Sequence, residues 1–350
     1  MRALVITKQT PFGEPVAGSV RLVEDWPDPG EPGRGQARVR TLASALNHLD
    51  LWVGHGVPGL SLTYPRVSGS DACGVVEAVG PGVDGAWVGK RVILNAASDA
   101  WAIAKPGEPS GGSLAPQYEL IGEHHHGTMA ERFVAPAANL AVVGEDRDPT
   151  EAAAYGLTFL TAYSMMVGKA GLRPGQLVLV TGIGGGVALA ALAIARQMGC
   201  AVAVTSRHQW KLDRAGELGA AMGVLDTGDD WSKPVRAWTG GRGVDVAVDS
   251  SGKATHIKCI KSLARGGAYV TPGCTSGHDA TTDLARIFWN QLRILGSTMG
   301  SNAEFGEVAA LYREGKLRPV VDRVFEASQG AEAYARLESA EQFGKVVVKW

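Results

Sequence analysis

The stretch Leu177–Ala195 reads LVLVTGIGGGVALAALAIA, and it decides the fold of the chain around it. It opens with a continuous apolar run of the kind that a strand buried on both faces requires. A glycine cluster follows at once, and the chain then continues as an apolar helical run without a further breaker. A strand, a tight glycine turn and a helix together aim backbone N–H groups at a pyrophosphate on the helix N-terminus. The stretch therefore predicts a dinucleotide site.

The glycines of this turn have a steric reason, because a side chain would hold the phosphates away from the backbone. The spacing is Gly182-x-x-Gly185-x-x-Ala188, with an apolar run before it and a helical run after it. A glycine pattern alone also occurs in turns that bind no ligand, but the flanking strand and helix favour the dinucleotide site. The turn residues predicted to contact the cofactor are Gly182, Gly184, Gly185, Gly186 and Val187.

The second strand of this unit, at 201–205, ends without the acidic residue that grips the adenosine ribose hydroxyls and selects NAD. In its place stand Ser206 and Arg207, with Lys211 shortly after. A hydroxyl, a guanidinium and an ammonium suit a 2′-phosphate, so the sequence favours NADP(H) over NAD(H). The alternative is that Arg207 and Lys211 belong to a solvated loop and helix start.

Composition excludes several classes of function. The 350 residues carry a formal net charge of −1 and no basic tract, which gives no support for nucleic-acid binding. The four cysteines form no C-x-x-C pair, so neither a disulfide framework nor a four-thiolate zinc site is expected. The N-terminus lacks the apolar core of a signal peptide, and the most apolar segment is broken by glycine. We expect a soluble cytoplasmic protein with a small-molecule substrate and no membrane partner.

The length allows two domains. Residues 1–148 contain short strands split by glycine and proline turns, which predicts a compact β-barrel-like domain. Helix–strand alternation begins at 149, with a helix over 152–168 and strands at 177–180, 201–205, 224–225, 244–248, 267–270 and 293–297. These strands predict an α/β fold with an open, doubly wound parallel sheet. A last strand at 345–348 is expected to rejoin the first domain.

Several segments together resemble the medium-chain dehydrogenase/reductase superfamily over essentially the whole chain. Besides the glycine turn, they are 47–50 (NHLD), 69–76 (GSDACGVV), 157–163 (LTFLTAY), 217–220 (ELGA), 245–252 (DVAVDSSG) and 343–347 (FGKVV). The resemblance implies a GroES-like β-rich catalytic domain over 1–148, completed by 300–350, and a Rossmann NADP(H)-binding domain over 149–299. It also implies an active site in the cleft between them, and a homodimer or homotetramer assembled through the edge strand near 293–299.

In the zinc alcohol dehydrogenases of that superfamily, a Cys, a His and a further Cys or Asp hold the catalytic metal. The matching positions here are Asn47, Ser70 and about Leu157, none of which is an ordinary zinc ligand. The segment that carries four structural-zinc cysteines in those enzymes corresponds to 95–123, which has no cysteine. The chain therefore resembles the zinc-independent branch of quinone oxidoreductases and enoyl reductases, and we expect no bound metal.

Without a Lewis acid, nothing lowers the pKa of an alcohol substrate or polarises a simple ketone. Quinones, enals, enones and enoyl thioesters accept hydride without that help, because their conjugation spreads the negative charge. The expected function is therefore NADPH-dependent reduction of a quinone or activated alkene. Two alternatives stay open: an alcohol or aldehyde dehydrogenase of the zinc-type family with unexpected metal ligands, and a cofactor-binding protein with little catalysis.

Three residues are candidates for the catalytic step: Asn47, Tyr64 and Thr158. Asn47 is either an amide donor to a substrate carbonyl or a purely structural amide. Tyr64 is either a proton donor to the reduced substrate or a packed loop tyrosine, and the second interpretation is preferred. The family position of Thr158 implies that it lies near the nicotinamide.

Further cofactor contacts are expected outside the glycine turn. The family position of His48 often faces the cofactor phosphates. The carboxyl edge of a doubly wound sheet is where dinucleotides bind, and the strands predicted at 244–248 and 267–270 end there. The residues expected at that edge are Ser250, Thr271 and Gly273. The three histidines at 124–126 are interpreted as a solvated loop, because adjacent side chains cannot all point at one ion without an unusual turn.

Overall fold

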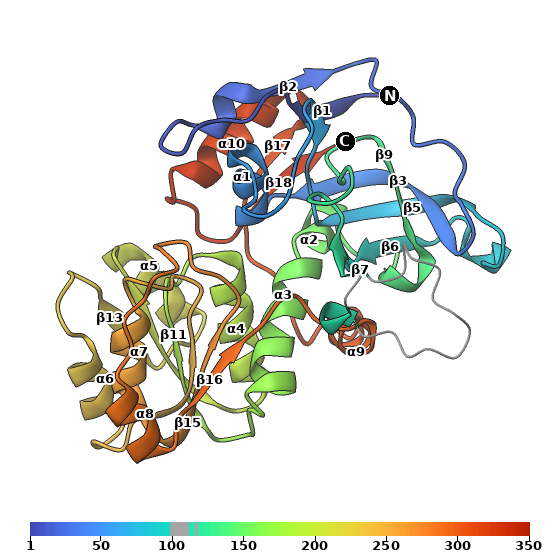
Figure 1. Cartoon of the computed structure of the whole chain (residues 1–350). Helices are drawn as coiled ribbons and strands as arrows, with labels where there is room; N and C mark the ends of the chain where they lie inside the picture. Colours follow the sequence, from blue (N-terminus) through green and yellow to red (C-terminus); the bar gives the residue numbers. More distant parts are fainter. Residues whose placement is uncertain (99–111, 116–117) are drawn as a thin grey trace. The chain divides into compact units, whose positions relative to one another are not determined.

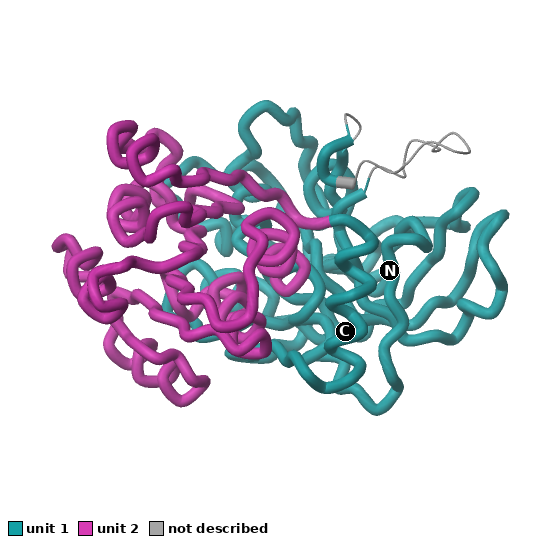
Figure 2. The backbone as a smooth tube through the Cα atoms, turned by 90° about the horizontal axis from the view of Figure 1, so that it is seen from below, with its two compact units in different colours: residues 1–157, 301–350 teal, residues 158–300 magenta. Residues whose placement is uncertain are grey.

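A computed structural model describes residues 1–98, 112–115 and 118–350, and these residues form two compact units (Figure 2). The first unit comprises Met1–Leu157 and Ser301–Trp350, and the second comprises Thr158–Gly300. The division therefore falls after the boundary at 148 that the sequence suggested. The reason is that the short helix α2 (Pro149–Ala153) packs on strands of the first unit.

The second unit is built on a six-stranded parallel sheet with the order β13-β12-β11-β14-β15-β16 (Figure 1). Its strands are β11 (Leu177–Val180), β12 (Ala201–Ser206), β13 (Met222–Leu225), β14 (Val244–Val248), β15 (Leu263–Thr271) and β16 (Arg293–Gly296). Helices that pack against it are α4 (Gly186–Gln197), α5 (Gln209–Glu217), α6 (Ser232–Trp238), α7 (His256–Ser262) and α8 (Leu284–Asn290). The strand order reverses between β11 and β14, which confirms the predicted doubly wound sheet.

This sheet is parallel because its central strands are apolar on both faces and need helices on each side. Val178, Leu179 and Val180 of β11 are all fully buried. Leu179 belongs to a core cluster that also contains Ala203 of β12 and Tyr269 of β15. The consequence for function is that the carboxyl ends of β11, β12, β14 and β15 are fixed along one edge.

The first unit contains a seven-stranded, mostly antiparallel sheet whose main path is β10-β6-β5-β3-β18-β17, with β9 paired to β3. The strands are β3 (Gln36–Ala45), β5 (Ala72–Val79), β6 (Arg91–Leu94), β9 (Arg132–Pro136), β10 (Leu140–Val142), β17 (Val321–Glu326) and β18 (Lys345–Lys349). A three-stranded sheet has the order β2-β1-β4, from Val20–Val23, Ala3–Ile6 and Arg66–Val67. Besides α2, the described residues of the unit form the helices α1 (His48–His55), α9 (Asn302–Arg313) and α10 (Gly330–Glu338). Strand β18 pairs antiparallel with β3, so the last strand rejoins the first domain as predicted.

The single helix predicted over 152–168 is interrupted. After α2, helix α3 (Gly156–Tyr163) begins, and a π-helical turn over Ser164–Lys169 follows it. The interruption comes from a tertiary contact: Leu157 donates its backbone N–H to Asp71 Oδ1 at 2.7 Å. A Cβ on Gly156 would lie 2.5 Å from the carbonyl oxygen of Leu94, so only glycine fits where the chain passes this strand. A buried carboxylate has taken a backbone donor that a continuous helix would use.

Part of the 95–123 segment, including Trp101, lies outside the described residues. Its described ends form a short antiparallel pair, β7 (Ala97–Ser98) with β8 (Glu119–Leu120). Within the described residues, no helix combines the length and the apolar character that crossing a bilayer requires.

Candidate functional site

The glycine turn of the second unit has the backbone that a phosphate-binding turn requires. Gly182 has φ 63° and Gly184 has φ 114°, a region that L side chains rarely adopt. A Cβ built on Gly185 would meet only the carbonyl oxygen of Gly182, at 3.7 Å, so the space before the N-terminus of α4 is open. No side chain caps that N-terminus. Its backbone N–H groups are free of a side-chain cap, as a pyrophosphate site requires, and the contact with a dinucleotide stays a prediction.

A buried carboxylate holds the residue that directly precedes this turn. Asp249, at the end of β14, is 0% exposed and accepts a hydrogen bond from Thr181 Oγ1 at 2.6 Å. It also accepts from Thr255 Oγ1 at 2.8 Å, Tyr269 OH at 2.9 Å and the backbone N–H of Ser251 at 3.0 Å. These five residues, the Asp249 cluster, tie together the ends of β11, β14 and β15. Because Thr181 directly precedes the glycine turn, the cluster fixes where the turn begins.

The end of β12 carries the residues predicted for the 2′-phosphate. Ser206 is buried, and its Oγ accepts the backbone N–H of His208 at 3.1 Å. Arg207 is exposed, as a residue that meets a ligand from solvent should be. Lys211 is buried on α5, with its ammonium 5.3 Å from the centre of the Trp210 ring, so it is not the solvated side chain of the alternative interpretation. No carboxylate stands at positions 206–208.

The other predicted cofactor residues of this unit lie at the same edge of the sheet. Ser250 follows the end of β14, and Thr271 ends β15. The hydroxyl of Thr271 donates to the carbonyl oxygen of Gly273 at 2.7 Å, which closes a small turn there. Thr158 is buried on α3. The sheet thus brings the predicted residues of β11, β12, β14 and β15 to one edge, while their contacts with a cofactor remain predictions.

The first unit contains a buried polar cluster that the sequence revealed only in part. It consists of Asn47, Ser70, Asp71 and Lys345, and we call it the Lys345 cluster. The Lys345 ammonium lies 2.9 Å from Asp71 Oδ2 and also donates to Asn47 Oδ1. Asn47 Nδ2 donates to Asp71 Oδ2 at 2.9 Å and to Ser70 Oγ at 3.2 Å. All four residues are buried, with 7% exposure at Asn47 and 4% at Lys345.

Local structure explains how these side chains meet. Asn47 follows β3 and precedes α1, Asp71 precedes β5, and Lys345 begins β18. Strand β3 pairs with both β5 and β18, so three segments distant in sequence come together at one end of the sheet. The amide of Asn47 is held in one orientation, because an ammonium only donates and a carboxylate only accepts.

Asp50 holds the backbone on both sides of the Lys345 cluster, beside Asn47 and beside Ser70. Its carboxylate accepts the backbone N–H groups of Asn47 and Gly69, each at 2.7 Å. Burial raises the pKa of Asp50 to about 6, against the opposing effect of those hydrogen bonds and of the Lys345 charge. The residue therefore acts as a structural hydrogen-bond partner of the segment that carries Asn47.

Two other predicted residues of the first unit have simple surroundings. Tyr64 donates its hydroxyl to the carbonyl oxygen of Val53 at 2.6 Å and packs against the apolar core, and burial raises its pKa. This is the geometry of a packed loop tyrosine, and the role of proton donor remains a prediction. His48 is exposed at the first position of α1.

The three histidines at 124–126 point to different partners. His125 Nε2 lies 2.7 Å from Glu119, and His124 Nδ1 accepts the backbone N–H of Leu120 at 3.1 Å. His126 Nδ1 accepts the backbone N–H of Val67 at 3.3 Å. In the described parts of the chain, no three His, Cys, Asp or Glu side chains are arranged to hold a metal ion.

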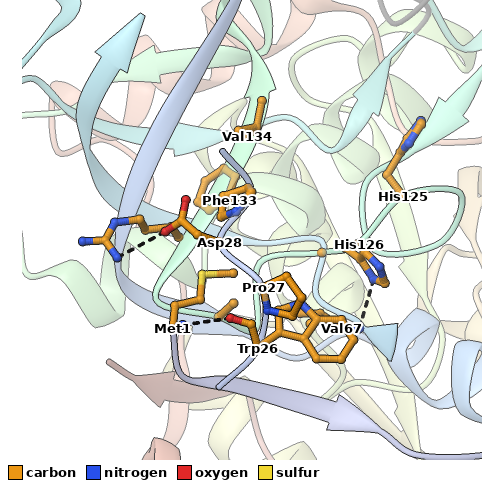
Figure 3. A pocket seen from close by; sticks show the side chains of 13 residues that line it. Met1, Trp26, Pro27, Asp28, Val67, His125, His126, Phe133 and Val134 are labelled. Carbon is orange, nitrogen blue, oxygen red and sulfur yellow. Dashed lines mark hydrogen bonds and ion pairs between the residues drawn. The ribbon is translucent and has the colours of Figure 1, made fainter. Parts of the chain in front are cut away.

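A separate pocket of about 280 Å³ lies beside these histidines (Figure 3). Its walls are mainly apolar, with Trp26, Val67 and Phe133 among them, and the N-terminal amine of Met1 donates to the Trp26 carbonyl oxygen at 2.8 Å. None of the residues predicted for catalysis or cofactor binding lines this pocket.

The positions that hold zinc in the alcohol dehydrogenases do not fit that metal here. Zinc sites use thiolate, imidazole and carboxylate ligands. Asn47 presents an amide whose oxygen and nitrogen are both engaged, Ser70 presents a hydroxyl, and Leu157 presents an aliphatic side chain. Asp71 is the only carboxylate among the residues of the Lys345 cluster, and it is paired with an ammonium.

Comparison with known proteins identifies the family. Residues 33–145 match the alcohol dehydrogenase GroES-like domain, and residues 186–314 match the family described as zinc-binding dehydrogenase. The zinc-type alcohol dehydrogenase-like protein YogA of Leptosphaeria maculans is 30% identical over 335 residues, which cover 91% of each chain. The chain belongs to the medium-chain dehydrogenase/reductase superfamily. Membership makes it an oxidoreductase of a superfamily that uses nicotinamide cofactors, and it confirms the predicted GroES-like and Rossmann domains.

Individual relatives of this superfamily member differ in their chemistry. A crystal structure described as an NAD-dependent alcohol dehydrogenase is 43% identical, with a TM-score of 0.91 and full coverage of both chains. A 2-haloacrylate reductase from Burkholderia sp. is 28% identical over 337 residues, covering 91% of this chain and 92% of the relative. The family therefore does not by itself decide between alcohol oxidation and alkene reduction.

Sequence reasoning missed two features of these sites. The role of Lys345 is one of them, although a lysine that opens the apolar run at 346–348 is a candidate for burial beside a carboxylate. The role of Asp249 beneath the glycine turn is the other. Its signal was a carboxylate directly after a buried strand in the nucleotide-binding unit.

Proposed function

We propose that the chain is an NADPH-dependent reductase of quinones or activated alkenes that works without catalytic zinc. The observation that carries the proposal is the Lys345 cluster, because it places an amide, a hydroxyl and an internal ion pair where the alcohol dehydrogenases hold a metal. The match to a 2-haloacrylate reductase supports the same class, since its described substrate is an activated alkene.

The chemistry of the acceptor follows from the residues that are present. The nicotinamide, when bound, supplies the hydride. The Asn47 amide is a neutral hydrogen-bond donor, and a delocalised enolate or quinol oxygen needs less stabilisation from such a donor than a localised alkoxide does. Conjugated acceptors spread the incoming charge and need only such a donor together with correct orientation. Simple ketones need stronger polarisation, which in this superfamily comes from zinc.

The end of β12 supports a preference for NADPH. Arg207 is exposed beside the buried Ser206, and no carboxylate is present there to bind the ribose hydroxyls. A guanidinium suits a phosphate through charge-assisted hydrogen bonds. Against a preference for NADPH stands the 43% identical structure, which is described as NAD-dependent. Comparing kcat/KM for NADPH and NADH decides between the two coenzymes.

The second candidate is alcohol dehydrogenase chemistry, which the descriptions of two relatives favour. One experiment separates the candidates: elemental analysis of the untagged protein, with NADPH oxidation measured before and after chelation. Reduction of a 1,4-quinone or an enone that is unaffected by chelator, in protein without stoichiometric zinc, supports the proposed function. About one zinc per chain, with activity lost on chelation, would establish alcohol dehydrogenase chemistry. NADPH binding without turnover over the whole panel would indicate a cofactor-binding protein with little catalysis.

We also propose that two copies of the chain pair through β16. This strand is at the edge of the parallel sheet, so among the described residues one row of its backbone groups has no partner strand. Three large apolar side chains of the neighbouring helix α8 are exposed, namely Leu284 (73%), Phe288 (71%) and Trp289 (69%). An edge strand that follows a helix with exposed apolar side chains suits a two-fold contact between copies.

A further inference from the structure

We propose that Lys345 is a positioning residue, which fixes and polarises the Asn47 amide so that one N–H is directed at the carbonyl oxygen of the acceptor. The inference rests on the proposed function and adds a residue to it. Three observations carry it: the orientation of the amide, the unequal strength of its hydrogen bonds and the charge balance of the Lys345 cluster.

The orientation of the amide is set by charge. The Lys345 ammonium holds Asn47 Oδ1, and Asp71 Oδ2 accepts from Asn47 Nδ2 at 2.9 Å. A rotation of the amide by 180° would put its N–H groups against the ammonium and its oxygen against the carboxylate. Both contacts would be repulsive, so one orientation is strongly favoured.

The second N–H of the amide has the weakest contact in the cluster. It points to Ser70 Oγ at 3.2 Å, whereas the bonds to Asp71 are shorter and charge-assisted. A carbonyl oxygen that replaced the Ser70 hydroxyl as acceptor would therefore displace the least favourable contact. A cation on the amide oxygen also strengthens the N–H donors of the same amide, because hydrogen bonds in a chain polarise one another. The ammonium thus acts on the acceptor through Asn47.

The charge balance explains why the cluster is stable when buried. Asp71 is 0% exposed, and a lone carboxylate there would be strongly unfavourable. Lys345 neutralises it at 2.9 Å, and the N–H of Leu157 and the Asn47 amide also donate to it. Removing Lys345 therefore has two separable effects: it leaves Asp71 uncompensated, and it releases the Asn47 oxygen.

The experiment separates these effects with three variants and a control. Lys345→Met removes both the positive charge beside Asp71 and the contact that orients the Asn47 amide. Lys345→Met combined with Asp71→Asn also removes the contact that orients the Asn47 amide, but it leaves no uncompensated carboxylate at position 71. Lys345→Arg keeps a cation that only donates. Arg336→Met is the control, because it removes another ion pair of the first unit, Arg336 with Asp322 at 2.9 Å, in which no residue of the cluster takes part. The readouts are Tm, kcat and KM for an enone with NADPH, and the side-chain amide resonances of Asn47 in protein labelled with 15N-asparagine.

We expect Lys345→Met to lower kcat for the enone by about tenfold or more at a temperature where the variant is folded, with KM for NADPH unchanged. The double variant should recover Tm but not kcat, and Lys345→Arg should retain most of kcat. The control should lose Tm without losing kcat. In the spectra, the Asn47 amide resonances should shift in both methionine variants but not in the control.

Two results would overturn the inference. One is a double variant, or a folded Lys345→Met variant, whose kcat lies within twofold of wild type. The other is an Asn47 amide spectrum that is unchanged without Lys345. Failure of the wild-type protein to reduce any quinone or enone would refute the proposed function instead. The amide spectrum still tests the position of Asn47 in that case, because it does not depend on turnover.

Discussion

Replacing Asp249 with Asn tests whether the Asp249 cluster supports the cofactor turn. The carboxylate accepts four hydrogen bonds from Thr181, Ser251, Thr255 and Tyr269, all within 3.0 Å. A hydrogen bond to a charged group contributes about 1 kcal/mol more than one to a neutral group. Asparagine also turns an N–H₂ group toward one of the donors. Relief of a buried charge offsets part of the loss, so we expect a net destabilisation of about 3 kcal/mol.

That loss corresponds to a Tm decrease on the order of 10 °C for a unit of this size, measured by circular dichroism or scanning calorimetry. Tyr269→Phe removes a single donor and should cost roughly 1–2 kcal/mol, which gives an internal scale. Because Thr181 adjoins Gly182, Asp249→Asn should also weaken NADPH binding, measured by titration of NADPH fluorescence. An Asp249→Asn protein with wild-type Tm and wild-type affinity for NADPH would show that the cluster does not support the turn.

Three further predictions concern coenzyme choice, pH and assembly. Arg207→Ala should raise KM for NADPH roughly tenfold or more while changing KM for NADH little; equal changes would remove Arg207 from the phosphate site. Because burial raises the pKa of Asp50 to about 6 from its ordinary 3.8, the folded state holds more protons between these values, and the contribution of Asp50 to stability falls as pH rises through this window. The free energy of unfolding is measured by urea denaturation from pH 4 to 7. As the pH rises, the value for Asp50→Asn should increase relative to that of wild type, by up to about 3 kcal/mol. The same pH dependence in both proteins would contradict a raised pKa for Asp50. Trp289→Glu on α8 should convert a dimer into a monomer in light scattering, whereas a wild-type monomer would refute pairing through β16.

The sequence predicted the second unit well because its signals are local. The bounds predicted for β11 and β14 match the structure, and the order of the strands follows from alternation with helices. The glycine turn could be located from composition alone, since positive φ at Gly182 and Gly184 demands glycine. The helix over 152–168 was predicted less well. Its interruption depends on a bond from Leu157 to Asp71, which is 86 positions away.

The catalytic candidates depended more on tertiary contacts. Nothing in the neighbourhood of Asn47 along the chain shows that its amide lies between a cation and a carboxylate. The two partners are 298 and 24 positions away. Tyr64 was a candidate proton donor by residue type, and its contact with the carbonyl oxygen of Val53 became visible only in the folded loop.

By itself, the sequence determined the fold class, the position of the glycine turn and the loss of the residue types that hold zinc. These properties follow from periodicity, from the steric needs of glycine and from the chemistry of single side chains, which act over a few residues. The tertiary structure alone decided that Lys345 is buried and that it faces Asn47 and Asp71. A lysine is solvated by default, and its burial is stable only where the fold supplies a carboxylate in contact with it. In this chain that carboxylate comes from the other end of the sequence.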